Sequence, residues 1–279
     1  MKIGISCEST CDLPKSYIEE NDIRIFPLAI NFEDKEFIDG KTITPNEIFE
    51  KVNKGSALPK TSARSVGEYI EFFKEIKKEY DVLIHIAFSS ELSCSCQNAI
   101  LASKEVDGVY VIDSKNLSSG HGLVIMTAVD ERRKEESIEE IIKNVENIVP
   151  KVRTSFVVNT MVYLNKGGRC SSLTRIAATL LKIKPSLKVV DGKIIVGKKY
   201  MGKLNDSIAK YIDDTLNENP NCKKDKIFIT YSSCELIDVE FMKEKLRKHG
   251  FENIIETTAS CTISTHCGPN TIGILFIDN

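Results

Sequence analysis

The sequence predicts an α/β fold of two domains, and three features of the chain carry that prediction. Short apolar runs of strand length alternate with amphipathic helices through the first half, which indicates a mostly parallel, Rossmann-like sheet with flanking helices. A hairpin signal at Asp191-Gly192 interrupts this alternation later and favours a mixed α/β sandwich. The length of 279 residues suits two hydrophobic cores. The expected domains are residues 1–153 and 154–279.

The first half alternates strands and helices in a regular order. Capping boxes at Thr44, Ser65 and Ser137 mark helix starts, because each places a hydroxyl three residues before a glutamate. The polar segment Leu58–Arg64 is expected to be an irregular loop, and a further helix is expected from about Gly120. Apolar runs predict strands at Ile3–Ser6, Ile23–Leu28, Val82–Phe88 and Val109–Asp113.

The second half does not keep the regular alternation of strands and helices, because a hairpin is expected near its middle at Asp191-Gly192. A glycine-hinged loop is expected at Leu164–Ser171, followed by a helix that carries the apolar residues from Leu173 to Leu181. The other expected strands are Ser155–Thr160, Ser186–Val190, Lys193–Val196, Ile227–Tyr231, Asn253–Thr257 and Thr271–Ile277. The other expected helices are Leu204–Leu216 and Ile237–His249, the second stopped by Gly250.

Composition argues against several classes of function. A net charge of −2 without a basic block makes a nucleic-acid partner unlikely on electrostatic grounds. No apolar run reaches membrane-spanning length, so stable membrane insertion is not expected, and the first residues are typical of a strand rather than a signal peptide. The nine cysteines match no metal-binding spacing, and in the cytoplasmic location that we expect they should be reduced and mostly buried. We therefore predict no metal and no cofactor.

Hydroxyl-rich turns occur at three places far apart in the chain. The apolar run that ends at Phe88 stops in a turn containing Ser93, which is placed to be an N-cap, a ligand-binding hydroxyl, or both. The other turns contain Thr61 with Ser62, and His266, which is expected in a loop. Hydroxyls, a helix start and a histidine can bind an anion without placing a full counter-charge beside it. A purely structural role for His266 is an equal alternative.

A serine and a histidine also raise the alternative of an acyl hydrolase or transferase that uses Ser93 and His266. The chain has no Gly-x-Ser-x-Gly turn, and no acidic residue is marked to orient His266. The segment Gly167-Gly168-Arg169 lacks the spacing of a phosphate-binding loop, so a nucleotide-binding role is weakly supported. Binding and acyl chemistry both stay open at this point.

A series of motifs, specific in its order and spacing, runs along nearly the whole chain: Glu8-Ser9-Thr10-Cys11-Asp12-Leu13-Pro14, Pro59-Lys60-Thr61-Ser62, Ser89-Ser90-Glu91-Leu92-Ser93, Val111-Ile112-Asp113-Ser114, Leu164-Asn165-Lys166-Gly167-Gly168-Arg169-Cys170-Ser171, Ile183-Lys184-Pro185 and Thr265-His266-Cys267-Gly268-Pro269. In these motifs the chain resembles the DegV family of bacterial fatty-acid-binding proteins. The resemblance implies a two-domain α/β protein that is not an enzyme. Such a protein would bury one long-chain fatty acid, such as palmitate, between its domains.

The resemblance also implies roles for individual residues. The carboxylate would be held by Thr61, Ser62, Ser93 and His266. Some family members present the acyl carboxylate to a separate ATP-dependent fatty acid kinase, which makes acyl-phosphate for phospholipid synthesis. Arg169 resembles the residue that such members use near the head group or the partner surface.

The sequence departs from the family pattern at four places. Glu8 stands where aspartate is usual, Ala63-Arg64 replaces Gln-Pro, Cys94-Ser95-Cys96 replaces Gly-Thr-Tyr, and Asn270 replaces a glycine. These changes bear on ligand chain length and kinase pairing more than on the fold. The change at Cys94 can alter the backbone's reach toward the carboxylate, because glycine allows a closer approach.

Overall fold

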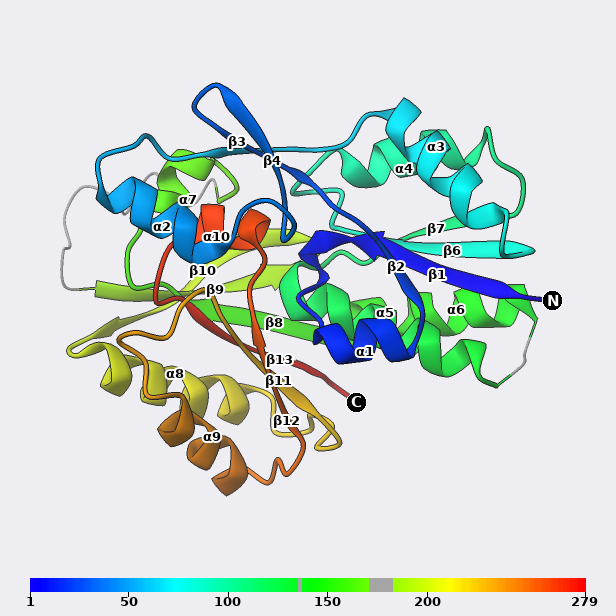
Figure 1. Ribbon diagram of the computed structural model, residues 1–279. Coiled ribbons are helices and arrows are strands. Elements are labelled where there is room, and N and C mark those ends of the chain that lie inside the picture. The colour runs from blue at the N-terminus through cyan, green and yellow to red at the C-terminus, as the bar shows by residue number, and fades with distance from the viewer. Residues whose placement is uncertain (135–136, 171–182) are drawn as a thin grey trace.

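Two β-sheets with a buried helix between them form the body of the molecule (Figure 1). The structure, a computed structural model, describes residues 1–134, 137–170 and 183–279. The central helix, α5 (Ser118–Arg132), packs against strands of both sheets and is buried along most of its length. Its middle part, from Gly122 to Val129, is mostly apolar, which suits a helix that is covered on most sides. One continuous hydrophobic core therefore joins the two sheets through α5.

The first sheet has four strands in the order β2-β1-β6-β7, and all of its pairs are parallel, as the sequence predicts. Helices cover both of its faces, with α3 and α4 on one side and α1, α5 and α6 on the other (Figure 1). The bounds are β1 Ile3–Glu8, β2 Ile23–Phe26, β6 Val82–Ala87, β7 Val109–Asp113, α1 Lys15–Glu20, α3 Val66–Lys77, α4 Ser95–Ser103 and α6 Ile138–Ile148, with a short 3₁₀ turn, η1, at Ser9–Cys11.

The second sheet has six strands in the order β10-β9-β8-β13-β11-β12, of which only the β11–β12 pair is parallel. Strand β13 lies inside this sheet, between β8 and β11. Helices α8 and α9 cover the face away from α5 (Figure 1). The bounds are β8 Val152–Val157, β9 Ile183–Val190, β10 Lys193–Met201, β11 Ile227–Tyr231, β12 Ile254–Thr258, β13 Ile272–Ile277, α8 Leu204–Glu218 and α9 Val239–Lys248, with a 3₁₀ turn, η2, at Val149–Lys151. The proposed domain boundary at 153/154 thus falls within β8 and stays a prediction.

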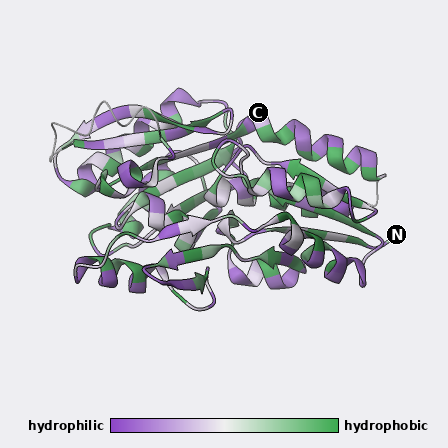
Figure 2. Cartoon of the chain, turned by 90° about the horizontal axis from the view of Figure 1, so that it is seen from above, coloured by the Kyte–Doolittle hydropathy of each residue, from purple (hydrophilic) through white to green (hydrophobic). Residues whose placement is uncertain are grey.

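Local signals locate several of these elements correctly. The Asp191-Gly192 turn joins β9 to β10 with Lys193 opposite Val190, as the hairpin signal predicts. Helix α2 (Pro45–Asn53) and helix α3 begin after complete capping boxes at Thr44 and Ser65. Hydrophobic strands fill the interior, whereas the outer helices alternate between hydrophilic and hydrophobic residues (Figure 2). Burial and capping together explain why these elements are readable from sequence.

The hairpin tip also ties the second sheet to the first. The Ser89 hydroxyl donates to the carbonyl oxygen of Gly192 at 2.9 Å, and Lys193 pairs with Glu91 at 3.4 Å. Gly192 has a φ of +82°, and a Cβ at this position would lie 2.6 Å from Ser89 Oγ. Only glycine meets both demands, so the turn after β6 is held by a residue that follows it by about a hundred positions.

Three segments differ from the sequence prediction. Leu58–Arg64 is not a simple loop, because β5 (Lys60–Ser62) pairs with β3 (Ala29–Phe32) in a small antiparallel sheet completed by β4 (Lys35–Ile38). A three-residue polar strand carries no periodic signal and is specified by its partner. The predicted glycine-hinged loop begins as helix α7 (Val162–Gly167), which ends at Gly168 with a φ of +68°.

The third difference concerns His266, which lies in helix α10 (Cys261–Cys267) and not in a loop. Helix α10 has only seven residues and is stabilised by contacts from distant segments, so its sequence alone is not typical of a helix. The helix expected over Leu173 to Leu181 lies outside the described residues.

Candidate functional site

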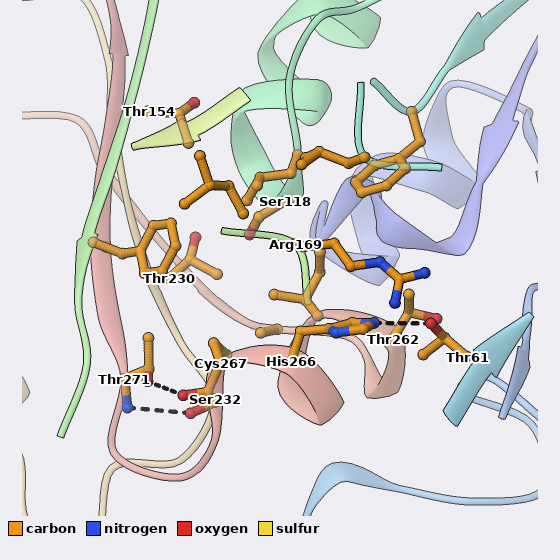
Figure 3. Close-up of a pocket in the computed structure, with 18 of the residues that line it drawn as sticks. Thr61, Ser118, Thr154, Arg169, Thr230, Ser232, Thr262, His266, Cys267 and Thr271 are labelled. Atoms are coloured by element: carbon orange, nitrogen blue, oxygen red, sulfur yellow. Dashed lines mark hydrogen bonds between the residues drawn. The ribbon is translucent and has the colours of Figure 1, made fainter. Parts of the chain in front are cut away.

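A cavity lies where α10, β5, the turn after β6, and the sheet strands β8, β11 and β13 face one another. The space that water-sized molecules can occupy in it is about 90 Å³, within a wider atom-free region of about 890 Å³ that includes open solvent. Figure 3 shows Thr61, His266 and Arg169 at one end and Thr154 with Thr230 at the other. Its apolar lining comes mainly from Leu28, Phe88, Leu92, Leu117, Phe156, Leu164, Ile194, Ile263 and Leu275.

Thr61 and His266 meet at the first end, which we call the head end. Oγ1 of Thr61 and Nε2 of His266 are hydrogen-bonded at 2.8 Å, across 205 positions of sequence (Figure 3). The next residue of β5, Ser62, also lines the cavity, and its oxygen accepts a hydrogen bond from Asn31 Nδ2 at 2.6 Å. That bond leaves the Ser62 proton available to another acceptor.

Asp39 fixes the helix that carries His266. Its carboxylate accepts hydrogen bonds from the backbone amides of Cys261 at 2.8 Å and Thr262 at 3.2 Å, and from the Thr262 hydroxyl at 2.7 Å. Asp39 therefore acts as an N-terminal cap supplied from far along the chain. Sequence reasoning missed it, because Asp39 lies more than 200 positions before its partners and no local pattern marks it.

His266 is neutral at physiological pH. Burial lowers its pKa, and the nearby positive charge of Arg169 adds to this effect, giving a value of about 4. Its other ring nitrogen, Nδ1, has no hydrogen-bond partner within the described parts of the chain. A Cβ on Gly167 would lie 2.4 Å from Nδ1, so α7 approaches the imidazole closely only because residue 167 is glycine.

Ser93 lines the cavity from the turn between β6 and α4. It is not the N-cap of α4, because Cys94 occupies that position. Its Oγ accepts a hydrogen bond from the Ser95 amide at 3.2 Å and lies 2.9 Å from Ser95 Oγ. The hydrogen bonds of Ser93 thus go to Ser95 and that of His266 goes to Thr61, so the two do not form the nucleophile–base pair that a hydrolase needs.

Arg169 follows α7 and is exposed at the head end. Its guanidinium donates to the carbonyl oxygen of Gly167 at 2.7 Å. Among the described residues that line the cavity, it alone carries a formal charge at neutral pH. The predicted residues Thr61, Ser62, Ser93, His266 and Arg169 therefore all line one cavity. Four of them, all but Ser93, come from segments whose predicted conformation differs from the observed one.

The opposite end of the cavity, the tail end, is also lined by hydroxyls, but they are engaged with the protein. Thr154 donates to Asn116 Oδ1 at 2.8 Å, and Ser118 donates to the Asp12 carboxylate at 2.6 Å. Thr230 shares hydrogen bonds with the hydroxyls of Ser119 and Thr257. Because these partners lie in the protein, the tail end presents a largely apolar surface.

The described residues contain no group of three histidine, cysteine or acidic side chains that could hold a metal ion. No described helix is both long enough and apolar enough to cross a membrane. Seven of the nine cysteines are buried.

Comparison with known proteins decides the family, since the DegV family model matches residues 2–279. The chain belongs to the DegV family.

Individual DegV relatives match over their whole length. A DegV domain-containing protein of Caldanaerobacter subterraneus is 31% identical over 99% of this chain and 98% of its own. The fatty-acid-binding DegV protein of Thermus thermophilus has a TM-score of 0.93, with 27% identity and full coverage of both chains. A stearic-acid-binding protein of Eubacterium ventriosum has a TM-score of 0.85 and 26% identity, covering 99% of this chain and 98% of that one. The resemblance inferred from the motifs is thereby confirmed.

One DegV position can also be explained physically. Asn270, where the family resemblance led us to expect a glycine, has a φ of +55°. Asparagine tolerates the left-handed region better than other residues that carry a Cβ. Its Oδ1 accepts a hydrogen bond from the Leu236 amide at 2.9 Å, so the side chain also ties this turn to the segment before α9.

Proposed function

We propose that this DegV-family chain binds one long-chain fatty acid, such as palmitate, and holds it without chemical change. The observation that carries the proposal is the polarity of the cavity, which has an apolar wall along its length and its only formal charge, among the described lining residues, at one end. A ligand that fits this pattern has a long hydrocarbon tail and one small acidic head. The descriptions of the Thermus and Eubacterium relatives as fatty-acid and stearic-acid binders support it.

The head end is suited to a carboxyl group. Thr61, Ser62 and Ser93 supply hydroxyls, and His266 supplies a neutral imidazole. Arg169 lies exposed at the edge of this group, with its guanidinium bonded to the Gly167 carbonyl oxygen. Hydroxyls can donate to or accept from a carboxyl group without the desolvation cost of a buried ion pair. The hydrocarbon would then lie against side chains such as Phe88, Phe156 and Leu275, where burial of each methylene contributes about 0.8 kcal/mol.

Native mass spectrometry of the purified protein tests the binding role. We expect a complex heavier than the chain by the mass of one intact fatty acid, and a matching free acid after extraction. An unliganded protein that also fails to take up added palmitate would contradict the proposal. An active-serine probe separates the alternatives: labelling of Ser93 would support a hydrolase, and an unlabelled, acid-loaded protein supports a binder.

We also propose that the bound acid is presented to an ATP-dependent fatty acid kinase that forms acyl-phosphate. Arg169 is exposed beside the head end and pairs with a backbone carbonyl rather than a carboxylate, so its charge is available to an acidic partner surface. Exposed charges of this kind steer association more than they add static affinity. Arg169→Ala should therefore leave the fatty acid bound but slow acyl-phosphate formation in a reconstituted reaction.

The control for this experiment is Lys166→Ala, which removes an exposed positive charge from the preceding helix without touching the cavity lining. Unchanged turnover in Arg169→Ala would mean that this residue is ordinary surface. Loss of the fatty acid itself would instead make Arg169 a ligand-binding residue.

A further inference from the structure

The second sheet is split where strands β8 and β9 separate. Residues 155–157 of β8 pair with residues 186–188 of β9. Residues 152–154 of β8 and 189–190 of β9, all within the described chain, do not pair with each other. A cleft lies between these strand ends, and water-sized molecules can occupy about 660 Å³ of it. Neighbouring strand edges normally close such a gap by hydrogen bonding, so its presence needs a cause.

The tip of the β9–β10 hairpin is held away from β8 by contacts with the first sheet. The Ser89 hydroxyl donates to the carbonyl oxygen of Gly192 at 2.9 Å, and Lys193 pairs with Glu91 at 3.4 Å. Both contacts attach the tip to the turn after β6. Strand β8 is fixed on its other side by pairing with β13. The cleft is therefore set by the fold, because its two edges are tied to different parts of the molecule.

The cleft adjoins the tail end of the ligand cavity. Thr154 and Ser155 line both spaces. Thr154 lies at the end of the cavity away from Thr61 and His266 (Figure 3). A chain that starts at the head end and outgrows the cavity therefore reaches the cleft next.

Apolar side chains continue from the cavity into the cleft. Leu187, Val189 and Val196 line the cleft. They belong to, or pack against, the hydrophobic cluster that also contains the cavity residues Phe156 and Ile194. The other apolar residues of the cleft are Val149, Pro150, Val152 and Val190. A hydrocarbon chain that leaves the tail end would thus meet further apolar surface.

The rim of the cleft is charged and open to water. Lys198 pairs with Asp214 at 3.2 Å and with Glu218 at 3.0 Å, and Arg153 pairs with Asp278 at 3.0 Å. The Lys198 and Arg153 side chains are 50% and 41% exposed. Ion pairs this exposed keep their contact with solvent. The cleft therefore combines an apolar interior with a solvated mouth.

The enclosed cavity alone is small for a long tail. Water-sized molecules can occupy about 90 Å³ of it, whereas small-molecule sites have roughly 300–1,000 Å³. We propose that the cleft between β8 and β9 is an extension of the ligand site, which takes the far end of acyl chains longer than the cavity and lets that end reach water. The extension rests on the proposed function, because it concerns the tail of the same ligand.

Straight-chain saturated acids of increasing length test the extension on the full chain freed of lipid. From palmitic to icosanoic acid, we expect affinity to hold or to rise by up to about fourfold per methylene, because each added group meets apolar side chains. Val189→Trp fills the apolar interior of the cleft. It should weaken icosanoic acid by about tenfold or more and leave decanoic acid within about twofold of its wild-type affinity.

Two further variants make this comparison secure. Ile195→Trp is the matched control, because Ile195 is a half-buried residue of the neighbouring strand β10 that lines neither space. Val190→Trp enters the cleft from an exposed position and carries the test if Val189→Trp fails to fold.

Icosanedioic acid, which has a carboxyl group at each end, gives a readout in the wild-type protein. A closed tail end would bury the second carboxylate without a counter-charge, which would reduce affinity by about a hundredfold or more relative to icosanoic acid. In an open cleft that carboxylate stays in water, so we expect the two affinities to agree within about fivefold. Val189→Trp should weaken both acids, because neither far end can then reach the mouth.

The outcomes separate the extension from the proposed function. A wild-type protein that binds none of these acids overturns both. A wild-type protein that binds palmitic acid but rejects icosanoic and icosanedioic acids has a closed tail end, which overturns the extension alone. Unchanged icosanoic acid affinity in Val189→Trp and Val190→Trp would also overturn it. So would equal loss of decanoic and icosanoic acids, because the substitutions would then act on the fold rather than on the far end of the chain.

Discussion

The two ends of the cavity are built from the same residue types and yet have different chemistry. At the head end, Thr61, Ser62 and Ser93 are half-buried, and each hydroxyl has hydrogen-bonding capacity that its protein partners do not use. At the tail end, Thr154 and Thr230 are almost fully buried, and their hydroxyls are engaged with Asn116, Ser119 and Thr257. A hydroxyl that lines a cavity is therefore available to a ligand only when its hydrogen bonds are not already made within the protein.

Substitutions at one end of the cavity, with stability and ligand affinity both measured, test whether the two ends differ in this way. Tail-end substitutions should cost stability and spare binding of the head group, whereas head-end substitutions should do the reverse. The four predictions that follow run from the largest expected effect to the smallest.

Asp39→Ala should disturb both quantities, because it removes the support of the head end. Its loss leaves the amides of Cys261 and Thr262 without acceptors at the start of α10. We expect the free energy of unfolding in urea to fall by about 3 kcal/mol or more, and palmitate binding to weaken as His266 is displaced. Asp34→Ala, at an exposed position of the β3–β4 turn, is the control. Wild-type stability in Asp39→Ala would show that α10 is held in other ways.

Thr154→Val should separate stability from binding at the tail end. The change keeps the shape of the side chain but leaves the buried Oδ1 of Asn116 without its donor. The free energy of unfolding should fall by about 1–3 kcal/mol, while the affinity for palmitate changes little. A loss of affinity with unchanged stability would mean that the Thr154 hydroxyl faces the ligand after all.

Thr61→Val should produce the opposite pattern at the head end. The Thr61 side chain is half-buried and its hydroxyl is hydrogen-bonded to His266. In the unliganded variant, water can make the hydrogen bond to His266 that the hydroxyl made. We expect palmitate affinity to fall by about 0.5–1.5 kcal/mol with little change in melting temperature. Calorimetry on protein freed of lipid measures the first quantity and thermal unfolding the second. Retained affinity would remove Thr61 from the head-group site.

The smallest effect concerns His266 and pH. Its pKa is about 4 in the folded protein and about 6.5 when unfolded, so the unfolded chain binds the proton first as pH falls. The stability that this residue contributes is complete above pH 6.5 and is lost as pH falls toward 4. Because the side chain is half-buried, the loss should be at most about 1 kcal/mol.

The measurement for His266 is the difference in melting temperature between the wild type and His266→Asn across this range. Burial raises the pKa of Asp12 to about 7, so its contribution is lost as pH rises instead, and it is common to both proteins. Parallel pH profiles for the two proteins would show that His266 keeps an ordinary pKa in the fold.

Sequence patterns predict the elements that are determined by residues close together in the chain. The capping boxes at Thr44 and Ser65 and the Asp191-Gly192 turn depend on residues within a few positions of each other, and the structure places all three as predicted. Alternation of strands and helices was likewise enough to indicate the parallel sheet.

The features that sequence patterns missed depend on contacts between residues that are far apart in the chain. Strand β5 exists because β3 pairs with it, and α10 is capped by Asp39 from more than 200 positions away. The hydrogen bond of Tyr69 with Glu8 spans 61 positions, so no local pattern near either residue predicts it. The hydroxyl-rich turns were recognisable as a group, but no local pattern distinguishes a hydroxyl facing the cavity from one already bonded to a neighbour.

The position of β13 has a consequence for how the molecule is made. This strand, Ile272–Ile277, pairs with both β8 and β11 and carries Gly273 and Leu275 of the cavity wall. During synthesis the first sheet can form early, but the interior of the second cannot close until residue 277 has left the ribosome. Until then one side of α5 lacks its cover. The cavity wall therefore stays incomplete until β13 has joined the sheet.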